Sequence, residues 1–293
     1  MKFIVAPVII LCFLLILSCK TTQPGGWRTV INKSPLEKIV TYHFAAFDSQ
    51  DFGMVTGFAG QIFYTTDRAA TWKQSANKSF DLFTLEINGP YIWACGEKGN
   101  VRVSKNSGMT FEPLKNFGRS EPDHCRFLSF VSPDNGWIAS ATTLASTADG
   151  GRTWSILRLP PDSARIVAID LFADAQGVVM DRNAGLYFTG DGGKHWHLKR
   201  LVSPLHKPDL KVHTSPTVAL RFRNPKQGMV IARIKNPFSY TIFYTGNGGN
   251  SWNSRILSTD RDYMEGTVYI SRDMNTITLL DSEDQTVSVF TNR

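Results

Sequence analysis

The chain has 293 residues, of which 32 are Lys or Arg and 25 are Asp or Glu, and its formal charge is +7. The basic residues form no run, so we expect no nucleic-acid partner, and a weak attraction to acidic surfaces is the most that this balance supports. Residues 27–293 are long for one domain, but closed all-β domains of this size are common.

The N-terminus carries an apolar segment, residues 3–17, directly after Lys2. It is shorter than the roughly 20 residues that a spanning helix needs, and it has the form of a processing signal. The sequence ILSC, which ends at Cys19, resembles the lipobox of bacterial lipoprotein precursors. That resemblance implies that residues 1–18 are removed, that Cys19 is acylated and that residues 19–26 form a lipidated tether. An ordinary secretory signal is the alternative. Because Lys20 is not the Asp associated with inner-membrane retention, we expect an outer-membrane anchor.

An eight-residue pattern follows five times: TTDRAATW, SKNSGMTF, TADGGRTW, TGDGGKHW and TGNGGNSW. Its Asp or Asn can accept hydrogen bonds from backbone N–H groups of a tight turn, and its glycine permits positive φ. The final aromatic begins a return strand and packs beside the next unit. Ala69 replaces this glycine in the first copy, which predicts a strained or differently shaped turn. We assign structural roles to Asp67, Trp72, Asn106, Phe111, Asp149, Trp154, Asp191, Trp196, Asn247 and Trp252.

The segments between these turns contain short apolar runs punctuated by Gly, Pro, Asp and Asn, which predict four β-strands per unit. From Trp27 to Trp252 the aromatic residues are 45, 39, 43, 42 and 56 positions apart, a spacing that suits a four-stranded blade. Three strand-like runs follow Trp252 and lack a fourth. We therefore predict that residues 27–293 form an all-β, six-bladed β-propeller whose N-terminal strand closes the last blade. Five or seven blades, or a solenoid or sandwich, are the alternatives.

The five turns resemble the Asp-box, or BNR repeat. Over nearly all of its mature length the chain resembles the photosystem II stability and assembly factor-like family of propellers, which share the sialidase-superfamily fold. The resemblance implies a non-catalytic, monomeric platform that binds or assembles an envelope protein partner. The alternative partner is a glycan, bound or cleaved by a sialidase-like exo-glycosidase.

In a propeller with up-and-down blades the five turns share one face. The loops between second and third strands, and those between blades, form the opposite face, where function is expected. The 56-residue spacing also places an insertion, residues 205–213, on that face. Our candidate binding residues are Arg126, Arg165, Arg182, Lys207, Lys211, Arg233 and Tyr263.

A sialidase needs an arginine cluster for a carboxylate, a Tyr activated by Glu, and an acid. The chain could offer the four arginines above, Tyr263 with Glu265, and Asp181 or Asp123. However, the FRIP-like arginine motif is absent, and Tyr263 and Glu265 are close in sequence, whereas the sialidase pair comes from separate blades. We therefore expect no catalytic residue.

The remaining residues with potential chemistry predict little. The six histidines have no metal-ligand spacing, and the glycine-rich turns lack the helix that follows a phosphate-binding loop. We expect neither a metal nor a cofactor. Cys95 and Cys125 could form a disulfide in an oxidising envelope, but two separate buried thiols are the expectation.

Overall fold

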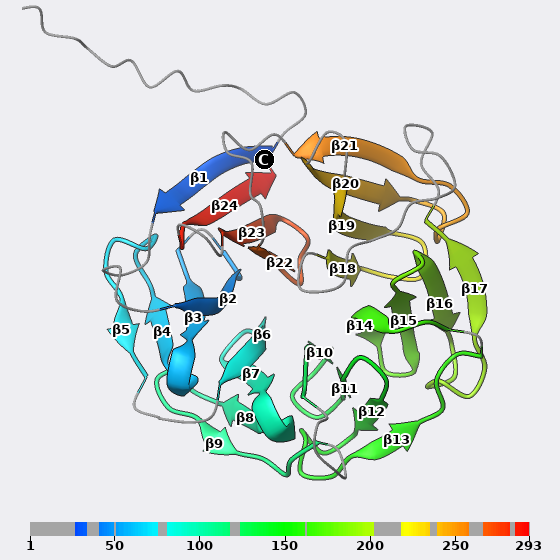
Figure 1. Ribbon diagram of the computed structural model, residues 1–293, viewed down its shortest axis with the longest axis horizontal. Coiled ribbons are helices and arrows are strands. Elements are labelled where there is room, and N and C mark those ends of the chain that lie inside the picture. Colours follow the sequence, from blue (N-terminus) through cyan, green and yellow to red (C-terminus); the bar gives the residue numbers. More distant parts are fainter. Residues whose placement is uncertain are drawn as a thin grey trace, which may run out of the picture.

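The computed structural model describes residues 27–33, 41–49, 51–75, 81–117, 124–161, 163–201, 218–234, 239–257, 266–281 and 285–292. These residues form six four-stranded antiparallel sheets. The sheets are arranged as blades in a ring around a central axis (Figure 1). The prediction of a six-bladed β-propeller is confirmed, and the five-bladed and seven-bladed alternatives are wrong.

Each of the first five blades is built from four consecutive strands. Blade 1 contains β2 (Tyr42–Phe47), β3 (Gly53–Gly57), β4 (Ile62–Thr65) and β5 (Lys73–Gln74). Blade 2 contains β6 (Leu82–Asn88), β7 (Tyr91–Gly96), β8 (Val101–Ser104) and β9 (Glu112–Pro113). Blade 3 contains β10 (Phe127–Phe130), β11 (Gly136–Ala139), β12 (Leu144–Thr147) and β13 (Ser155–Leu157). Blade 4 contains β14 (Ile166–Ala173), β15 (Gln176–Asp181), β16 (Gly185–Thr189) and β17 (His197–Arg200). Blade 5 contains β18 (Val218–Phe222), β19 (Gly228–Ile234), β20 (Ser239–Thr245) and β21 (Asn253–Leu257).

Two short 3-10 helices, η1 (Phe58–Gly60) and η2 (Glu97–Gly99), connect the second and third strands of blades 1 and 2. Among the described residues there is no helix long and apolar enough to cross a membrane.

Blade 6 joins the two ends of the described chain. It contains β22 (Gly266–Ile270), β23 (Thr276–Asp281), β24 (Val287–Asn292) and β1 (Trp27–Lys33). Strand β1 pairs antiparallel with β24, and Trp27 lies opposite Asn292. The predicted closure by the N-terminal strand is therefore confirmed. The pairing covers the edge of β24 that would otherwise be open, and it completes the fourth strand of blade 6.

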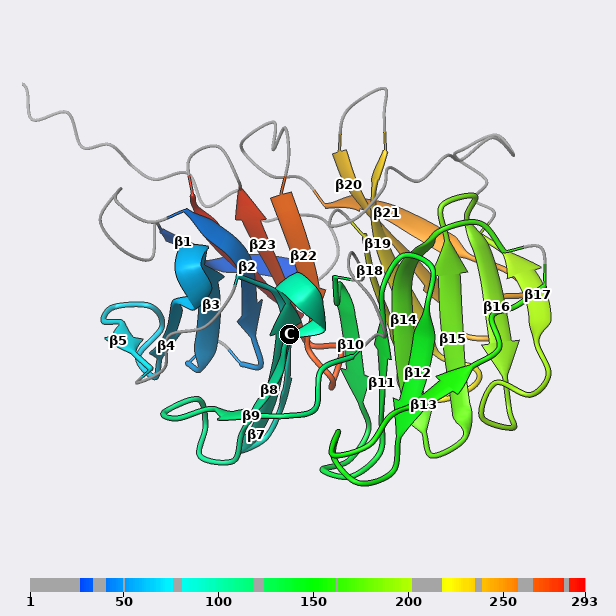
Figure 2. The same cartoon turned by 60° about the horizontal axis from the view of Figure 1, so that its bottom comes forward.

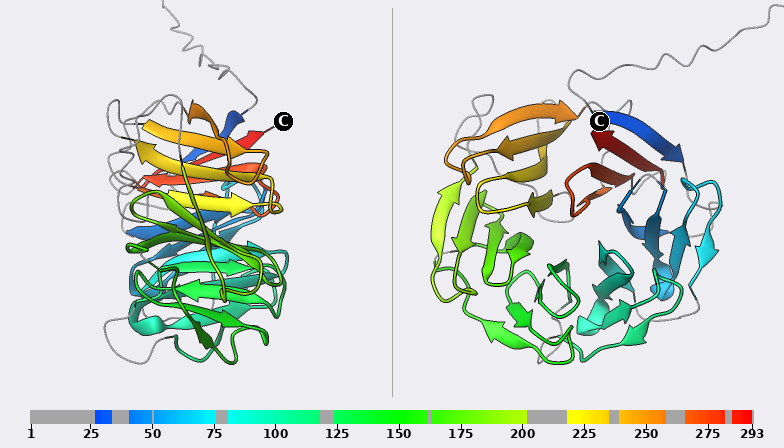
Figure 3. Two further views of the ribbon diagram at one scale, coloured as in Figure 1. Left: turned by 90° about the vertical axis from the view of Figure 1, so that its right-hand side faces the viewer. Right: turned by 180° about the vertical axis from the view of Figure 1, so that it is seen from behind.

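The core lies between the blades. Six clusters of buried apolar side chains fill the six spaces between adjacent sheets. In the space between blades 2 and 3, the rings of Trp93 and Phe130 stack with their centroids 3.9 Å apart. The innermost strands of neighbouring blades contact one another around the axis (Figure 3). Each blade thus depends on both of its neighbours for burial.

The repeated turns have the hydrogen bonds that their residue types suggest. In the third copy, Thr147 Oγ1 donates to Asp149 Oδ1 over 2.8 Å, and the backbone N–H of Thr153 donates to the same carboxylate oxygen over 2.9 Å. The Thr153 hydroxyl, which donates to Asp149 Oδ2 over 2.6 Å, and then the Thr153 backbone N–H lower the pKa of Asp149 to about 2. The indole N–H of Trp154 donates to the Lys115 carbonyl of the preceding blade over 3.2 Å. Each turn is therefore closed internally, and in the third and fourth copies the indole of Trp154 or Trp196 also links the turn to the blade before.

The first turn keeps this shape in spite of its alanine. The Ala69 N–H donates to Thr65 Oγ1 over 3.0 Å, as the equivalent glycines do in the other copies. Ala69 has a φ of 60°, in the left-handed region that non-glycine residues seldom occupy. The expected difference is thus one of backbone strain and not of shape.

Cys95 and Cys125 form a disulfide, with their Cα atoms 5.6 Å apart. The expectation of two separate thiols is wrong. The Cys125 N–H donates to the Gly96 carbonyl over 2.9 Å, which holds the segment before β10 against the end of β7. Sequence patterns place both cysteines near strands but do not show that these two strand ends meet across a blade interface.

Candidate functional site

The propeller has two unlike faces. The repeated turns lie on the same face as the hairpins that join first and second strands, because the Gly150 N–H donates to the Asp134 carbonyl over 2.9 Å. The other face, here called the loop face, carries the loops between second and third strands and the connections between blades. In Figure 2 the two short helices of the loop face lie toward the top of the disc and the repeated turns toward the bottom.

An axial cavity of about 200 Å³ lies on the loop-face side of the ring, between the six innermost strands. His43, Phe83 and Arg126 surround its mouth, and its walls expose polar and apolar atoms in about equal measure. These walls include Phe44, Leu85, Leu128, Ile169, Leu220 and Val268. The deepest lining residues are Glu86, Arg221 and Tyr269.

The mouth is built around the ring of Phe83. His43 and His124 meet this ring edge-on, with centroid distances of 5.9 and 5.7 Å. The guanidinium of Arg126 lies 5.8 Å from the ring centroid, a cation–π arrangement. Its backbone N–H donates to the Ala139 carbonyl over 2.9 Å. Because Arg126 follows the disulfide-bonded Cys125, its position at the mouth is fixed on both sides.

Arg126 keeps its charge available. The Asp81 carboxylate accepts a hydrogen bond of 2.6 Å from the Ala59 N–H and lies 3.6 Å from His43 Nε2. In the part of the chain that the structure describes, no carboxylate forms an ion pair with Arg126. The mouth therefore presents one exposed cation beside an aromatic ring.

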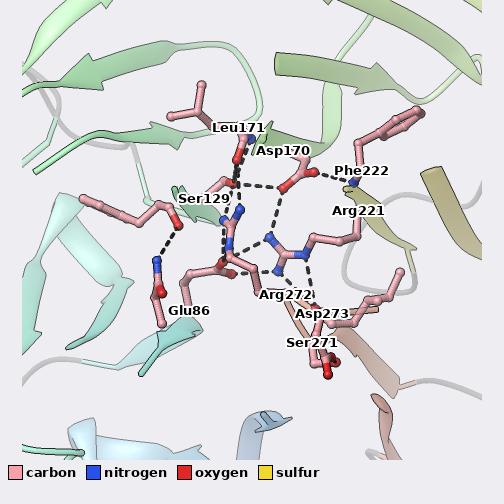
Figure 4. Close-up of polar contacts among 12 residues, drawn as sticks. Glu86, Ser129, Asp170, Leu171, Arg221, Phe222, Ser271, Arg272 and Asp273 are labelled. Carbon is pink, nitrogen blue, oxygen red and sulfur yellow. Dashed lines mark hydrogen bonds and ion pairs between the residues drawn. The ribbon is translucent and has the colours of Figure 1, made fainter. Parts of the chain in front are cut away.

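A central ion network forms the floor of the cavity, and it consists of Glu86, Ser129, Asp170, Arg221 and Arg272 (Figure 4). Arg221 donates to Glu86 over 2.9 and 3.0 Å and to Asp170 Oδ1 over 2.9 Å. Arg272 donates to Glu86 Oε1 over 2.8 Å, and Ser129 donates to Asp170 Oδ1 over 3.1 Å. Arg221 is 4% exposed and Asp170 is fully buried. Five blades, 2 to 6, thus meet through charged or hydroxyl side chains.

Strand register explains why these residues meet. Glu86, Ser129, Asp170 and Arg221 occupy the same position in four successive innermost strands. In each of these four blades, the next residue along the innermost strand pairs with a residue of the second strand. That second-strand residue pairs in turn with the Ser or Thr that opens the repeated turn. Equivalent positions lie at one level of the ring, so their side chains reach the same central region.

The network balances its own charges. Burial opposes the charged form of Arg221, but Glu86 and Asp170 together raise its pKa above the ordinary value. The pKa of Tyr269 is also raised, first by burial and then by the Glu86 carboxylate. Two guanidinium groups are therefore matched to two carboxylates, and the network holds no carboxylate without a cationic partner.

The structure brings only some of the predicted site residues to the cavity. Of the four nominated arginines, only Arg126 lines the cavity. Arg165 and Arg182 are exposed neighbours in blade 4, where the Arg182 N–H donates to the Arg165 carbonyl over 3.0 Å, and Arg233 lies near the end of β19. Asp123, Lys207, Lys211, Tyr263, Glu265 and Cys19 lie outside the described residues.

Asp181, a nominated acid, is the last residue of β15, and its side chain closes the turn that follows. Its carboxylate accepts hydrogen bonds from the backbone N–H groups of Ala164, Asn183 and Gly185 over 2.8 to 3.0 Å. The described ranges contain no group of three or more His, Cys, Asp or Glu side chains that could hold a metal ion.

Solved structures share this fold at low sequence identity. A protein of unknown function from Bacteroides thetaiotaomicron has a TM-score of 0.62 and 8% identity, over 92% of this chain and 76% of that one. YCF48, the photosystem II assembly factor, from Cyanidioschyzon merolae has a TM-score of 0.52 and 14% identity, over 92% of this chain and 99% of that one. The chain is a six-bladed β-propeller.

A GH74 xyloglucanase from Xanthomonas campestris is similar as well, with a TM-score of 0.56 and 13% identity over 86% of this chain. The likeness covers 45% of the xyloglucanase chain. No protein-family model matches the sequence, and no curated protein is similar to it. At these identities the similarities show the fold alone.

Proposed function

We propose that this protein is a non-catalytic binding platform that holds a segment of a protein partner at the axial cavity of its loop face. The observation that carries the proposal is the combination of a small cavity with a floor whose charges are already paired. The resemblance of the sequence to assembly factor-like propellers supports the same function. Acylation of Cys19 would hold the platform on the surface of a bacterial membrane, in an outer membrane where one exists.

The size and lining of the cavity favour a side chain as the occupant. Dry apolar cavities of about 150 Å³ hold a benzene molecule, whereas small-molecule sites usually measure about 300–1,000 Å³. The volume here, about 200 Å³, suits one large side chain. A sugar ring brings several hydroxyl groups, each of which would need a hydrogen-bond partner when buried. The charged side chains of the floor already bind one another and offer few such partners.

The glycosidase alternative finds less support. A sialidase-like site needs arginines that are free to bind a substrate carboxylate and an acid that can transfer a proton. The two arginines on the floor, Arg221 and Arg272, already bind Glu86 and Asp170. Arg165 and Arg182 do not line the cavity. We therefore favour binding over hydrolysis.

Site-specific photo-crosslinking tests this function. Phe58 is 63% exposed in η1 on the loop face, and the N–H of the next residue, Ala59, donates to Asp81, which lies 3.6 Å from the cavity-lining His43. Leu198 is 48% exposed on the outermost strand of blade 4. A photo-reactive phenylalanine at position 58, in cells that produce the protein, should form a covalent adduct with a defined polypeptide. The same group at position 198 should not form this adduct. Equal adducts at both positions, or release of reducing sugar from glycans by the purified protein, would contradict the proposal.

A further inference from the structure

We propose that one edge of the propeller, here called the anchor edge, rests on the anionic headgroups of the membrane that holds Cys19, so that the loop face points away from the lipid. The anchor edge belongs to the face that carries the repeated turns and is defined by Arg28, Arg223, Lys226 and Tyr244. This inference rests on the proposed function, because it takes the lipid on Cys19 as given. It is carried by the place where the chain enters the propeller and by the charge around that place.

The chain enters the propeller on the face that carries the repeated turns. Strand β1 begins at Trp27, which lies opposite Asn292 at the end of β24. The Asn292 N–H donates to the carbonyl of Asn275 over 3.0 Å, and Asn275 belongs to the hairpin between β22 and β23. Hairpins of this kind share the face of the repeated turns. At the rim, β1 lies next to β21 of blade 5 (Figures 1 and 3). The tether therefore joins the propeller at this face, between blades 5 and 6.

The length of the tether limits how the propeller can face the membrane. Residues 19–26 span at most about 29 Å when fully extended. The seven residues of β1 lead from this face to the loop face and cover about 23 Å, since a strand rises about 3.3 Å per residue. A loop face turned to the lipid would use most of the tether and would press the axial cavity against the headgroups. The opposite orientation leaves the tether slack and the cavity accessible.

The anchor edge is cationic. Arg223 and Lys226 are exposed in the hairpin between β18 and β19, and Arg28 is exposed in β1. Arg223 Nη2 donates to the carbonyl of Asp273 in blade 6 over 2.6 Å. The Gly248 N–H of the fifth repeated turn donates to the Lys226 carbonyl over 2.8 Å. These contacts hold the hairpin on this face. A lysine or arginine close to an anionic leaflet strengthens the association about fivefold.

The charge is uneven around the ring. At the anchor edge, the Asp273 carboxylate accepts hydrogen bonds from Ser271 and Asn275, and Arg272 is already paired with Glu86. In the hairpins and repeated turns of blades 3 and 4, by contrast, carboxylates outnumber cations. The carboxylates there are Asp134, Asp149, Asp174 and Asp191, and the cations are Arg152 and Lys194. An anionic surface therefore attracts the anchor edge and repels blades 3 and 4.

Tyr244 adds an aromatic group to the anchor edge. It is 43% exposed at the end of β20, directly before the fifth repeated turn. Phe188, at the same register position in blade 4, is partly buried, with its ring centroid 5.2 Å from that of Phe222. Tyrosine has an apolar ring and a polar tip and is enriched at the level of lipid headgroups. An exposed tyrosine beside cations thus fits a membrane surface.

Quenching by lipid tests the inference on the acylated chain in vesicles of phosphatidylglycerol and phosphatidylcholine whose headgroups carry a nitroxide. A cysteine introduced at the surface can be labelled with a fluorophore selectively, because Cys95 and Cys125 are joined in a disulfide. The label is placed at one exposed position in each of three variants, Asn250→Cys, Met109→Cys and Asn183→Cys.

The three positions report on different parts of the propeller. Asn250 lies in the fifth repeated turn, and Met109 takes the same place in the second turn, across the ring. Asn183 lies on the loop face, between β15 and β16. We expect the strongest quenching at position 250, quenching at least twofold weaker at position 109, and the weakest at position 183. The difference between positions 250 and 109 should shrink in vesicles of phosphatidylcholine alone.

A charge reversal tests the part played by the cations. Lys226→Glu should lower the population in contact with the lipid at least fivefold, so that quenching at position 250 approaches that at position 109. Lys194→Glu makes the same change at an exposed lysine of the fourth repeated turn and should leave the ratio unchanged. Equal quenching at positions 250 and 109, the strongest quenching at position 183, or a ratio that Lys226→Glu does not lower would overturn the inference.

Photo-crosslinking identifies the occupant of the anchor edge. A photo-reactive phenylalanine in place of Tyr244 should form an adduct with lipid. A protein adduct at this position, from a partner or from a second copy of the chain, would overturn the inference.

The two proposals can fail separately. A specific polypeptide adduct at position 58 without preferential quenching at position 250 would keep the platform function and reject the anchor edge. The expected quenching without an adduct at position 58 would reject the platform function only. A mature chain without lipid on Cys19 would reject the anchorage, and the inference with it.

Discussion

Substitution of Arg221 by methionine should destabilise the whole ring. The variant keeps the volume of the side chain but removes both ion pairs and the hydrogen bonds to the Ile270 carbonyl. Breaking a buried ion pair by removing one partner typically costs about 3–5 kcal/mol, because the remaining charge stays buried. Here Arg272 still binds Glu86, and Ser129 still donates to Asp170, so we expect about 3 kcal/mol.

The measurement is reversible unfolding of Arg221→Met by heat or guanidinium chloride. For a domain of this size, 1 kcal/mol corresponds to a shift of about 2 °C in Tm, so the expected decrease is about 6 °C. Arg223→Met is the matched control. This arginine is exposed two residues further along the chain and donates to the Asp273 carbonyl, and its removal should lower Tm by less than about 1 °C.

The double variant Arg221→Met/Asp170→Asn should recover part of this loss. Asp170 would then carry no charge, and the pair of Glu86 with Arg272 would remain balanced. Two results would refute the reasoning. One is a Tm of Arg221→Met within 1 °C of the unsubstituted protein, and the other is a double variant less stable than the single one.

Three further predictions concern separate parts of the chain. Asp149→Ala should lower stability by about 1 kcal/mol, by analogy with the loss of a helix cap. Because the folded pKa of Asp149, about 2, is below its unfolded value, its contribution is fully present above about pH 4 and is lost as pH falls toward 2. Urea titrations should therefore show that Asp149→Ala and the unsubstituted protein differ less in their free energy of unfolding at pH 2.5 than at pH 7. An equal difference at the two pH values would contradict the role given to the Asp149 carboxylate. The double variant Cys95→Ser/Cys125→Ser removes a covalent link between residues 30 positions apart. Its free energy of unfolding, and that of the reduced protein, should be about 3–4 kcal/mol lower. An unchanged Tm after reduction would argue against a structural disulfide. Cys19, finally, should be the acylated first residue of the mature chain, and Cys19→Ser should leave the membrane fraction, whereas a mature N-terminus at another residue would contradict the lipoprotein assignment.

The architecture was open to prediction because its signals are local. A turn such as Thr147 to Trp154 specifies its own hydrogen bonds, and its recurrence about every 40 residues indicates blades. The closing strand at Trp27 could be inferred by counting strands. The charged floor was not predicted, because Glu86, Asp170 and Arg221 are far apart in sequence and each stands alone in an apolar strand.

A signal for the floor existed nonetheless. An isolated charge in a buried strand, as in LEI, IDL and LRF, requires a partner, and alignment of the innermost strands by their register would have placed these charges at one level. The pairing of Cys95 with Cys125, and the position of Arg126 over Phe83, depend on how neighbouring blades dock. That docking is a property of three-dimensional packing, and no periodicity in the sequence records it.

The pairing of β1 with β24 also constrains the timing of folding. Trp27 is among the first described residues to leave the ribosome, but its partner Asn292 is synthesised 265 residues later. At about 5–20 residues per second, β1 remains without its partner strand for roughly 13–53 seconds. Blades 1 to 5 can form in sequence during this interval, whereas the ring closes only after β24 has been synthesised. A chain truncated before β24 would therefore leave β1 unpaired and open the edge of β23, which makes such fragments prone to aggregation and proteolysis.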